Sequence, residues 1–139
     1  MNLNWRNSDK TYAACPVLTD CDVAGYVKNG SLPADRHYLE VPAMKVVRNR
    51  GFWLKPSYRC HADATVFLVS TDAYEMNSDA LEGMRGGVYC FFSEKSGVHY
   101  LGRVNRQSSG GVLLSLIEGL HDPLVLHDLN YLGRVIAAA

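Results

Sequence analysis

Short runs of apolar and β-branched residues recur along the second half of the chain, with polar turns between them. Six such runs occupy residues 64–70, 88–92, 98–104, 112–117, 124–126 and 131–137. Runs of this length, separated by Gly, Asn, Ser and Pro, are typical of β-strands. The pattern therefore predicts a mainly β fold, a β-rich α+β single domain of short antiparallel strands that form a partly closed sheet.

Two of the separating segments have the composition of hairpin loops. Residues 94–97 read Glu-Lys-Ser-Gly, and residues 107–111 read Gln-Ser-Ser-Gly-Gly. Gly supplies positive φ in tight turns and Ser can bond to its own backbone there. We therefore expect the strands on either side of each loop to pair directly.

One or two short helices complete the prediction. Thr19 is a good N-cap for a helix over residues 20–29, with Val23, Tyr26 and Val27 on one face, and Gly30 would end it. Ser78 would cap a second helix over residues 79–85. These elements divide the chain into an N-terminal segment with a short helix, residues 1–37, and a β domain, residues 38–139.

Composition narrows the classes of function. The 139 residues include 14 Lys+Arg and 14 Asp+Glu, and 47% are hydrophobic. This is ordinary globular composition, and no apolar run approaches the ~20 residues that a membrane crossing needs. Zero net charge disfavours direct binding to nucleic acid, which requires a surplus of cations. One local basic cluster remains, either a solvated loop face or a binding patch: Lys45, Arg48, Arg50, Lys55 and Arg59.

Cysteine and histidine positions predict neither a metal site nor a cofactor. Cys15, Cys21, Cys60 and Cys90 fit none of the paired zinc spacings, and Cys90 lies in an apolar run typical of a buried strand. His61, His121 and His127 could gather around a metal, but no spacing fixes them. The polar N-terminus lacks the apolar stretch of a signal peptide, so we expect a cytoplasmic protein with reduced thiols.

Four sequence motifs occur in an order that points to a family. Residues 64–69 read Ala-Thr-Val-Phe-Leu-Val after Asp63, and residues 81–89 end in Arg-Gly-Gly-Val-Tyr. Residues 97–104 read Gly-Val-His-Tyr-Leu-Gly-Arg-Val, and residues 128–136 contain Gly-Arg-Val-Ile. In this order they resemble the C-terminal domain of LexA-like regulators, which include UmuD and lambda-type phage repressors. The resemblance covers about residues 38–137 and implies a β-rich, self-cleaving Ser/Lys peptidase domain that also dimerises.

The chemistry of that family is missing at the matching positions. In the first alignment of its Gly-Asp-Ser-Met-x-Pro motif, Trp53 stands in the place of the serine, within residues 51–56. In a second alignment, on residues 71–76, Ala73 stands there. The lysine is replaced by Gly102, before Arg103. A Ser/Lys dyad needs both partners within hydrogen-bond reach, so the resemblance implies a relative that is not an enzyme.

Two features leave a catalytic alternative open. The family cleaves itself at an Ala-Gly or Cys-Gly bond, and Ala24-Gly25 is such a pair, although it also fits inside the expected helix. A displaced active site would use Ser57, Ser70 or Cys60 as nucleophile and Lys55 or Lys95 as base. The alternative function is thus an active self-cleaving serine or cysteine peptidase.

The resemblance implies action by protein–protein contact. Such a protein would form a homodimer, or inhibit a repressor, an SOS-type regulator or another host protein, as a phage antirepressor does. Two interpretations of Trp53 are open: it is an exposed anchor for recognition of a partner, or it is a buried side chain that fills the core. The candidate partner or dimer surface comprises Phe52, Trp53, Leu124, Leu126, Tyr131 and Arg134. A further alternative is a small self-assembling module with no regulatory partner.

Overall fold

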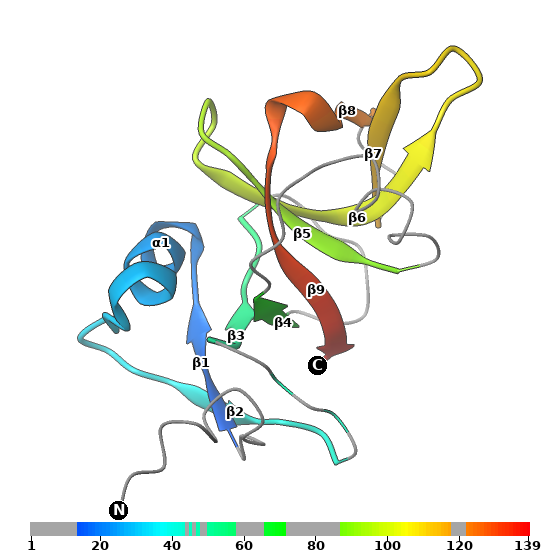
Figure 1. Cartoon of the computed structure of the whole chain (residues 1–139). Helices are drawn as coiled ribbons and strands as arrows, with labels where there is room; N and C mark the ends of the chain where they lie inside the picture. Colours follow the sequence, from blue (N-terminus) through cyan, green and yellow to red (C-terminus); the bar gives the residue numbers. More distant parts are fainter. Residues whose placement is uncertain are drawn as a thin grey trace, which may run out of the picture.

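The computed structural model describes residues 14–43, 45, 47, 50–57, 66–71, 87–117 and 122–139. Within this part the protein is mainly β, as predicted, with one mixed sheet of nine strands and a single α-helix (Figure 1). The elements in chain order are β1 (Ala14–Leu18), α1 (Asp20–Asn29), β2 (Tyr38–Glu40), β3 (Phe52–Leu54), β4 (Phe67–Thr71), β5 (Tyr89–Ser93), β6 (Val98–Arg106), β7 (Val112–Leu116), β8 (Leu124–Val125), the 3-10 helix η2 (Leu126–Asp128) and β9 (Asn130–Ala138). None of the described helices is long and apolar enough to span a membrane.

The strand order corrects two details of the predicted sheet. The strands follow one another as β2-β1-β3-β4-β9-β5-β6-β7-β8. The sheet is not purely antiparallel, because β1 and β3 run parallel through Val17 and Leu18. Nor is it partly closed, because β2 and β8 are opposite edges of an open sheet in the described part. β1, from the expected N-terminal segment, pairs with both β2 and β3.

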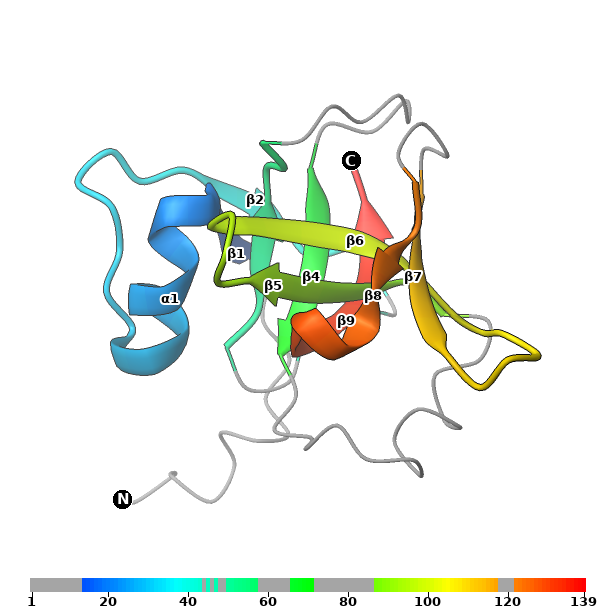
Figure 2. The same ribbon diagram turned by 90° about the horizontal axis from the view of Figure 1, so that it is seen from above.

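The long strand β9 lies at the centre of the sheet and joins its two halves. Its first part pairs with β5 and its second part with β4, both antiparallel. The register shifts at Leu68/Val69 and at Cys90/Phe91, and such irregularities bend strands and increase twist. As a result β5 and β6 run across the direction of β4 (Figure 2).

Helix α1 begins and ends where the sequence predicts. Thr19 is the N-cap, and the Asp22 carboxylate accepts hydrogen bonds from the Thr19 backbone N–H at 3.1 Å and from its hydroxyl at 2.9 Å. Gly30 ends the helix at φ +75°, a left-handed conformation that glycine adopts without strain. Val23 is 1% exposed, and Tyr26 and Val27 pack on the same core. The expected apolar face of the helix is therefore confirmed.

The core lies on both faces of the sheet. On the face that α1 covers, Val23 packs with a cluster of apolar side chains that includes Leu18, Phe52, Leu54, Phe67, Val69, Cys90 and Leu101. On the opposite face, alternate residues of the same strands form two more clusters, one around Trp53 and Leu68 and one around Phe91 and Leu114. β3 and β4 are therefore buried on both faces, which is why their sequences do not alternate.

Most of the predicted strands in the second half are confirmed with ends shifted by one or two residues. The runs at 88–92, 98–104, 112–117 and 131–137 correspond to β5, β6, β7 and β9. The expected strand over 124–126 stops at Val125, because Leu126 turns into η2. Both hairpin loops are present, with Gly97 at φ +71° and Gly110 at φ +94°. The second expected helix, residues 79–85, lies outside the described residues.

Candidate functional site

The position expected for a catalytic lysine has no room for a side chain. Gly102 lies in β6, buried between Tyr89 of β5 and Leu116 of β7. A Cβ atom at Gly102 would lie 2.9 Å from the backbone carbonyl carbon of Ser115 and would overlap the carbonyl oxygen. The obstacle is the backbone of a paired strand, which cannot rotate away as a side chain can. A lysine at this position would require β7 to move.

The position expected for the nucleophile in the first alignment belongs to the core. Trp53, in β3, is 1% exposed and packs with Cys15, Val47 and Leu68. Its indole Nε1 donates a hydrogen bond to the backbone oxygen of Leu39 at 3.2 Å, which satisfies the one polar group of the ring. Trp53 is thus core filler, and its interpretation as an exposed anchor is wrong. Ala73, from the second alignment, lies outside the described residues.

The other residues of the expected partner surface differ in exposure. Phe52 is fully buried under α1 and Leu126 is 5% exposed, so their assignment to a surface is also wrong. Leu124 and Tyr131 are half-buried, and the centroids of the Tyr131 and Phe91 rings are 5.4 Å apart. Arg134 is exposed but belongs to the central strand β9. At Arg134 this strand is paired with both β4 and β5, so the residue offers no free backbone edge to a partner.

The residues of the displaced active site are not assembled in the described part. Ser57 and Lys55 are exposed after β3, Lys95 is exposed in the β5–β6 turn, and Ser70 is buried in β4. Among the described residues no hydrogen bond joins the Ser57 hydroxyl to either lysine. Cys60 lies outside them. The Ala24-Gly25 bond is in the middle of α1, so this pair has helical backbone.

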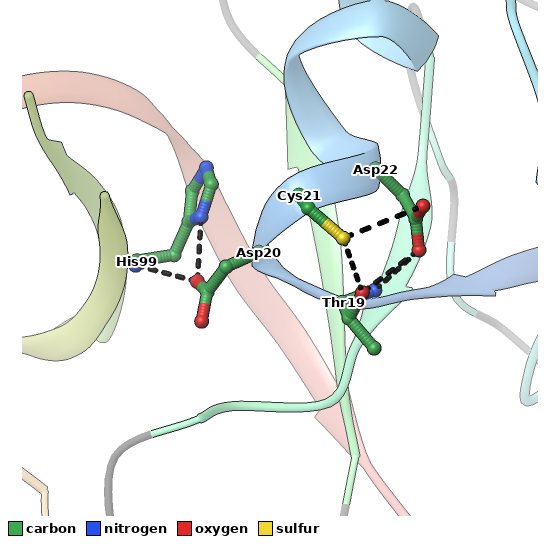
Figure 3. A network of polar contacts seen from close by, with 5 residues as sticks. All are labelled: Thr19, Asp20, Cys21, Asp22 and His99. Carbon is green, nitrogen blue, oxygen red and sulfur yellow. Dashed lines mark hydrogen bonds and ion pairs between the residues drawn. The ribbon is translucent and has the colours of Figure 1, made fainter.

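The structure instead brings together two polar residues that the sequence analysis did not connect. Asp20, the first residue of α1, and His99, in β6, are 79 positions apart. The Asp20 Oδ1 atom lies 2.7 Å from the His99 backbone nitrogen and 2.8 Å from His99 Nδ1 (Figure 3). A carboxylate oxygen only accepts hydrogen bonds, so the His99 backbone N–H and the Nδ1–H of its ring both donate to it. The contact fastens the N-terminus of α1 to the start of β6.

Burial dominates the electrostatics around this pair. The His99 side chain is 3% exposed, and burial lowers the pKa of its imidazole, although the hydrogen bond and the charge of Asp20 oppose that change. The centroid of the Phe92 ring lies 4.6 Å from the centroid of the imidazole ring. Asp20 Oδ2 is buried and has no hydrogen-bond partner among the described residues. A neutral imidazole is therefore the favoured form at neutral pH.

A thiol lies on the same face of the sheet as this pair. In the β5–β6 ladder Cys90 is opposite Leu101, and Phe92 is opposite His99, so all four side chains share one face. Burial, followed by the charge of Asp20, raises the pKa of the Cys90 thiol strongly. A thiol in that state is a poor nucleophile, so a Cys, a His and an Asp on one face do not make a catalytic triad here. Cys90 is the small buried residue that its apolar run predicts.

The remaining cysteines and cations do not form a site in the described residues. Burial raises the pKa of Cys15 to about 11, while Cys21 is exposed near the start of α1. The described residues contain no group of three or more His, Cys, Asp or Glu side chains that could hold a metal. His127 is exposed in η2, and His61 and His121 lie outside the described part. Of the basic cluster, Lys45, Arg50 and Lys55 are exposed, and Arg48 and Arg59 are not described.

Exposed large apolar side chains occur at both edges of the sheet. In the described part they are Tyr38, Leu39 and Val125, which are 50%, 39% and 52% exposed. Tyr38 and Leu39 belong to the edge strand β2, and Val125 belongs to the opposite edge strand β8. An edge strand has unpaired backbone donors and acceptors, and apolar residues beside them favour pairing with another chain.

No family model, curated protein or solved structure matches this chain. The resemblance to LexA-like domains therefore depends on the motifs at residues 64–69, 81–89, 97–104 and 128–136.

Proposed function

We propose that this chain is a non-catalytic, LexA-like regulatory protein of the cytoplasm that acts by protein–protein contact. It forms a homodimer and engages a repressor, an SOS-type regulator or another host protein, as a phage antirepressor does. The LexA-like character belongs to the proposal and is carried by the sequence motifs. The mainly β architecture of the described part is compatible with it.

The observation that carries the non-catalytic half of the proposal is the contact between Gly102 and Ser115. The lysine of the family would have to begin at a Cβ whose place is taken by the Ser115 carbonyl group. Burial of Trp53 supports the same conclusion from the other partner of the dyad, because that position is filled by an indole inside the core. In the first alignment, the two positions that must act together are thus filled by a strand backbone and by a core indole.

The contact half of the proposal is supported by the edges of the sheet. The large apolar side chains exposed in the described part all lie on β2 and β8. Pairing through an edge strand supplies main-chain hydrogen bonds, and exposed side chains beside the edge supply apolar contact. The balanced charge of the chain suits association with proteins better than with nucleic acid.

Self-cleavage is the direct test of the non-catalytic half. The pure protein is incubated at neutral and alkaline pH, and its intact mass is followed by mass spectrometry beside Ser57→Ala and Cys60→Ser variants. We expect the 15.4 kDa chain to persist in all three samples. A fragment that begins near Gly25 and disappears in one of the variants would establish the active peptidase instead.

Light scattering tests the homodimer. Twice the chain mass of 15.4 kDa is expected at working concentration. A mass that stays at 15.4 kDa over the accessible concentration range would overturn self-association and leave only contact with a different protein.

A further inference from the structure

Among the described strands β2 is paired only by β1, so its backbone presents hydrogen-bonding groups on the other side. The pairs Ala14–Glu40, Cys15–Leu39 and Pro16–Tyr38 fix its register with β1, and the Val17 backbone N–H donates to the His37 oxygen at 2.8 Å. Hydrogen-bonded pairs alternate along an antiparallel ladder. His37 and Leu39 therefore bond toward β1, while the backbone groups of Tyr38 and Glu40 point away from it.

We propose that β2 pairs antiparallel with β2 of a second copy of this chain, in a register centred on Tyr38. This inference rests on the proposed function and names the dimer partner and the surface. A two-fold axis at Tyr38 places the outward backbone groups of the two strands opposite one another. The sheet of one chain then continues into the sheet of the other, with β2 no longer an edge.

Charge complementarity specifies this register. With Tyr38 opposite its own counterpart, Arg36 of each chain lies opposite Glu40 of the other, so the two-fold axis creates two cation–anion pairs. Arg36 and Glu40 are both exposed, and neither makes an ion pair within the described residues. A register centred on Leu39 would place Glu40 opposite Tyr38 and leave Arg36 without an anion. The sequence around Tyr38 is thus self-complementary in one antiparallel register.

Apolar contact adds to these pairs. Tyr38 is 50% exposed and its counterpart would lie directly across the ladder on the same face. Leu39, 39% exposed, points to the other face, where it would lie opposite His37 of the second copy. Cross-strand aromatic pairs are among the stabilising pairs of antiparallel sheets. The opposite edge strand, β8, has two residues and one exposed large apolar side chain. It therefore offers a shorter ladder than β2 does.

Charge reversal tests this register between chains. Arg36→Glu gives a chain with two acidic positions, and Glu40→Arg gives a chain with two basic positions. Each variant alone faces like charges across the dimer axis, so we expect its dimer Kd to rise about tenfold or more above that of the unaltered chain. Mixing the two variants restores opposite charges, so the mixture forms heterodimers with a Kd within about threefold of the unaltered homodimer.

The geometry makes this restoration specific to pairing in trans. Residues 36 and 40 are four positions apart, which is roughly 13 Å of extended backbone, so the two charges of one chain do not face each other directly. The matched controls are Lys95→Glu and Glu94→Arg, which make the same charge changes in the exposed β5–β6 turn. Both controls should leave the dimer unchanged. Circular dichroism of each variant checks that the fold is retained.

The outcomes separate this inference from the proposed function. Dimers that are insensitive to Arg36→Glu and Glu40→Arg, or a mixture that fails to recover, overturn pairing through β2 and point to another surface such as β8. A chain that is monomeric throughout overturns it as well. In each case the intact-mass experiment still decides, independently, whether the chain is a peptidase.

Discussion

Asp20 accepts two hydrogen bonds through one oxygen, both from His99, at 2.7 Å from its backbone nitrogen and 2.8 Å from its ring. One contact thereby satisfies a buried main-chain donor and orients a buried imidazole. It also ties the first turn of α1 to the sheet across 79 positions of sequence. Two consequences of this contact can be measured.

Replacing Asp20 by Ala should destabilise the protein by about 2–3 kcal/mol, because two donors of His99 would be left buried without an acceptor. Asp20→Asn keeps one side-chain oxygen and should cost less. Urea unfolding at pH 7 measures both. Asp35→Ala removes an equally charged but exposed carboxylate and should leave stability unchanged. Equal effects of the Asp20 and Asp35 substitutions would contradict a structural role for the contact.

Stability should fall as the pH is lowered through the range just below 6.5. Burial lowers the pKa of His99 in the folded state from its ordinary 6.5, so the unfolded chain binds a proton first as pH falls. Between the lowered pKa of folded His99 and pH 6.5, proton uptake by His99 of the unfolded chain favours unfolding. Above pH 6.5 the full stability is retained. Unfolding free energies of the unaltered chain and of His99→Gln, compared from pH 7.5 to 5.5, isolate this contribution. Parallel curves for the two proteins would refute it.

Gly102→Ala should cost about 1–3 kcal/mol or prevent folding, because the added methyl group would overlap the Ser115 carbonyl of the paired strand. Gly111→Ala is the matched control, since the nearest atom to its Cβ is the flexible Gln107 side chain at 3.6 Å. We expect the control to unfold at nearly the same urea concentration as the unaltered chain. If Gly102→Ala did the same, β6 and β7 would have to lie farther apart than described.

Only one of the three described cysteines should react quickly with a thiol reagent in the native protein. Cys21 is exposed, whereas Cys15 and Cys90 are buried and free, with the pKa of Cys15 raised to about 11. In a Cys60→Ser background, titration with a disulfide reagent at pH 8 should count one fast thiol, and three after denaturation. Two or more fast thiols before denaturation would show that the core opens readily. Adding Cys21→Ser should abolish the fast reaction.

Apolar runs and the turn residues between them predict the hairpins of the second half, because neighbouring strands there are joined by short loops. β5, β6 and β7 follow one another with turns at Gly97 and Gly110, and α1 has both its N-cap and its terminal glycine. In each case the signal and the element that it predicts lie within a few residues. Local signals of this kind do not depend on where the rest of the chain goes.

Elements whose partners are distant in sequence are harder to predict. β1 contains Pro16, which argues against a strand, but Pro16 lies where β1 ends its pairing with β2 and begins pairing with β3. β3 has only three residues and is buried on both faces, so it shows no alternation. The Asp20–His99 contact requires knowing that α1 packs against β6. Thr19 and Asp20 fit the start of a helix equally well without it.

The central place of β9 has a consequence for the order in which the protein can be made. Strands β2, β1, β3 and β4 form one half of the sheet and β5 to β8 the other, and β9 supplies the ladder between them. A ribosome synthesises residues 130–138 after all these strands, so β4 and β5 emerge with one side unpaired. The backbone ladder between the two halves can form only when β9 leaves the exit tunnel, and the nascent chain is most exposed to mispairing during that interval.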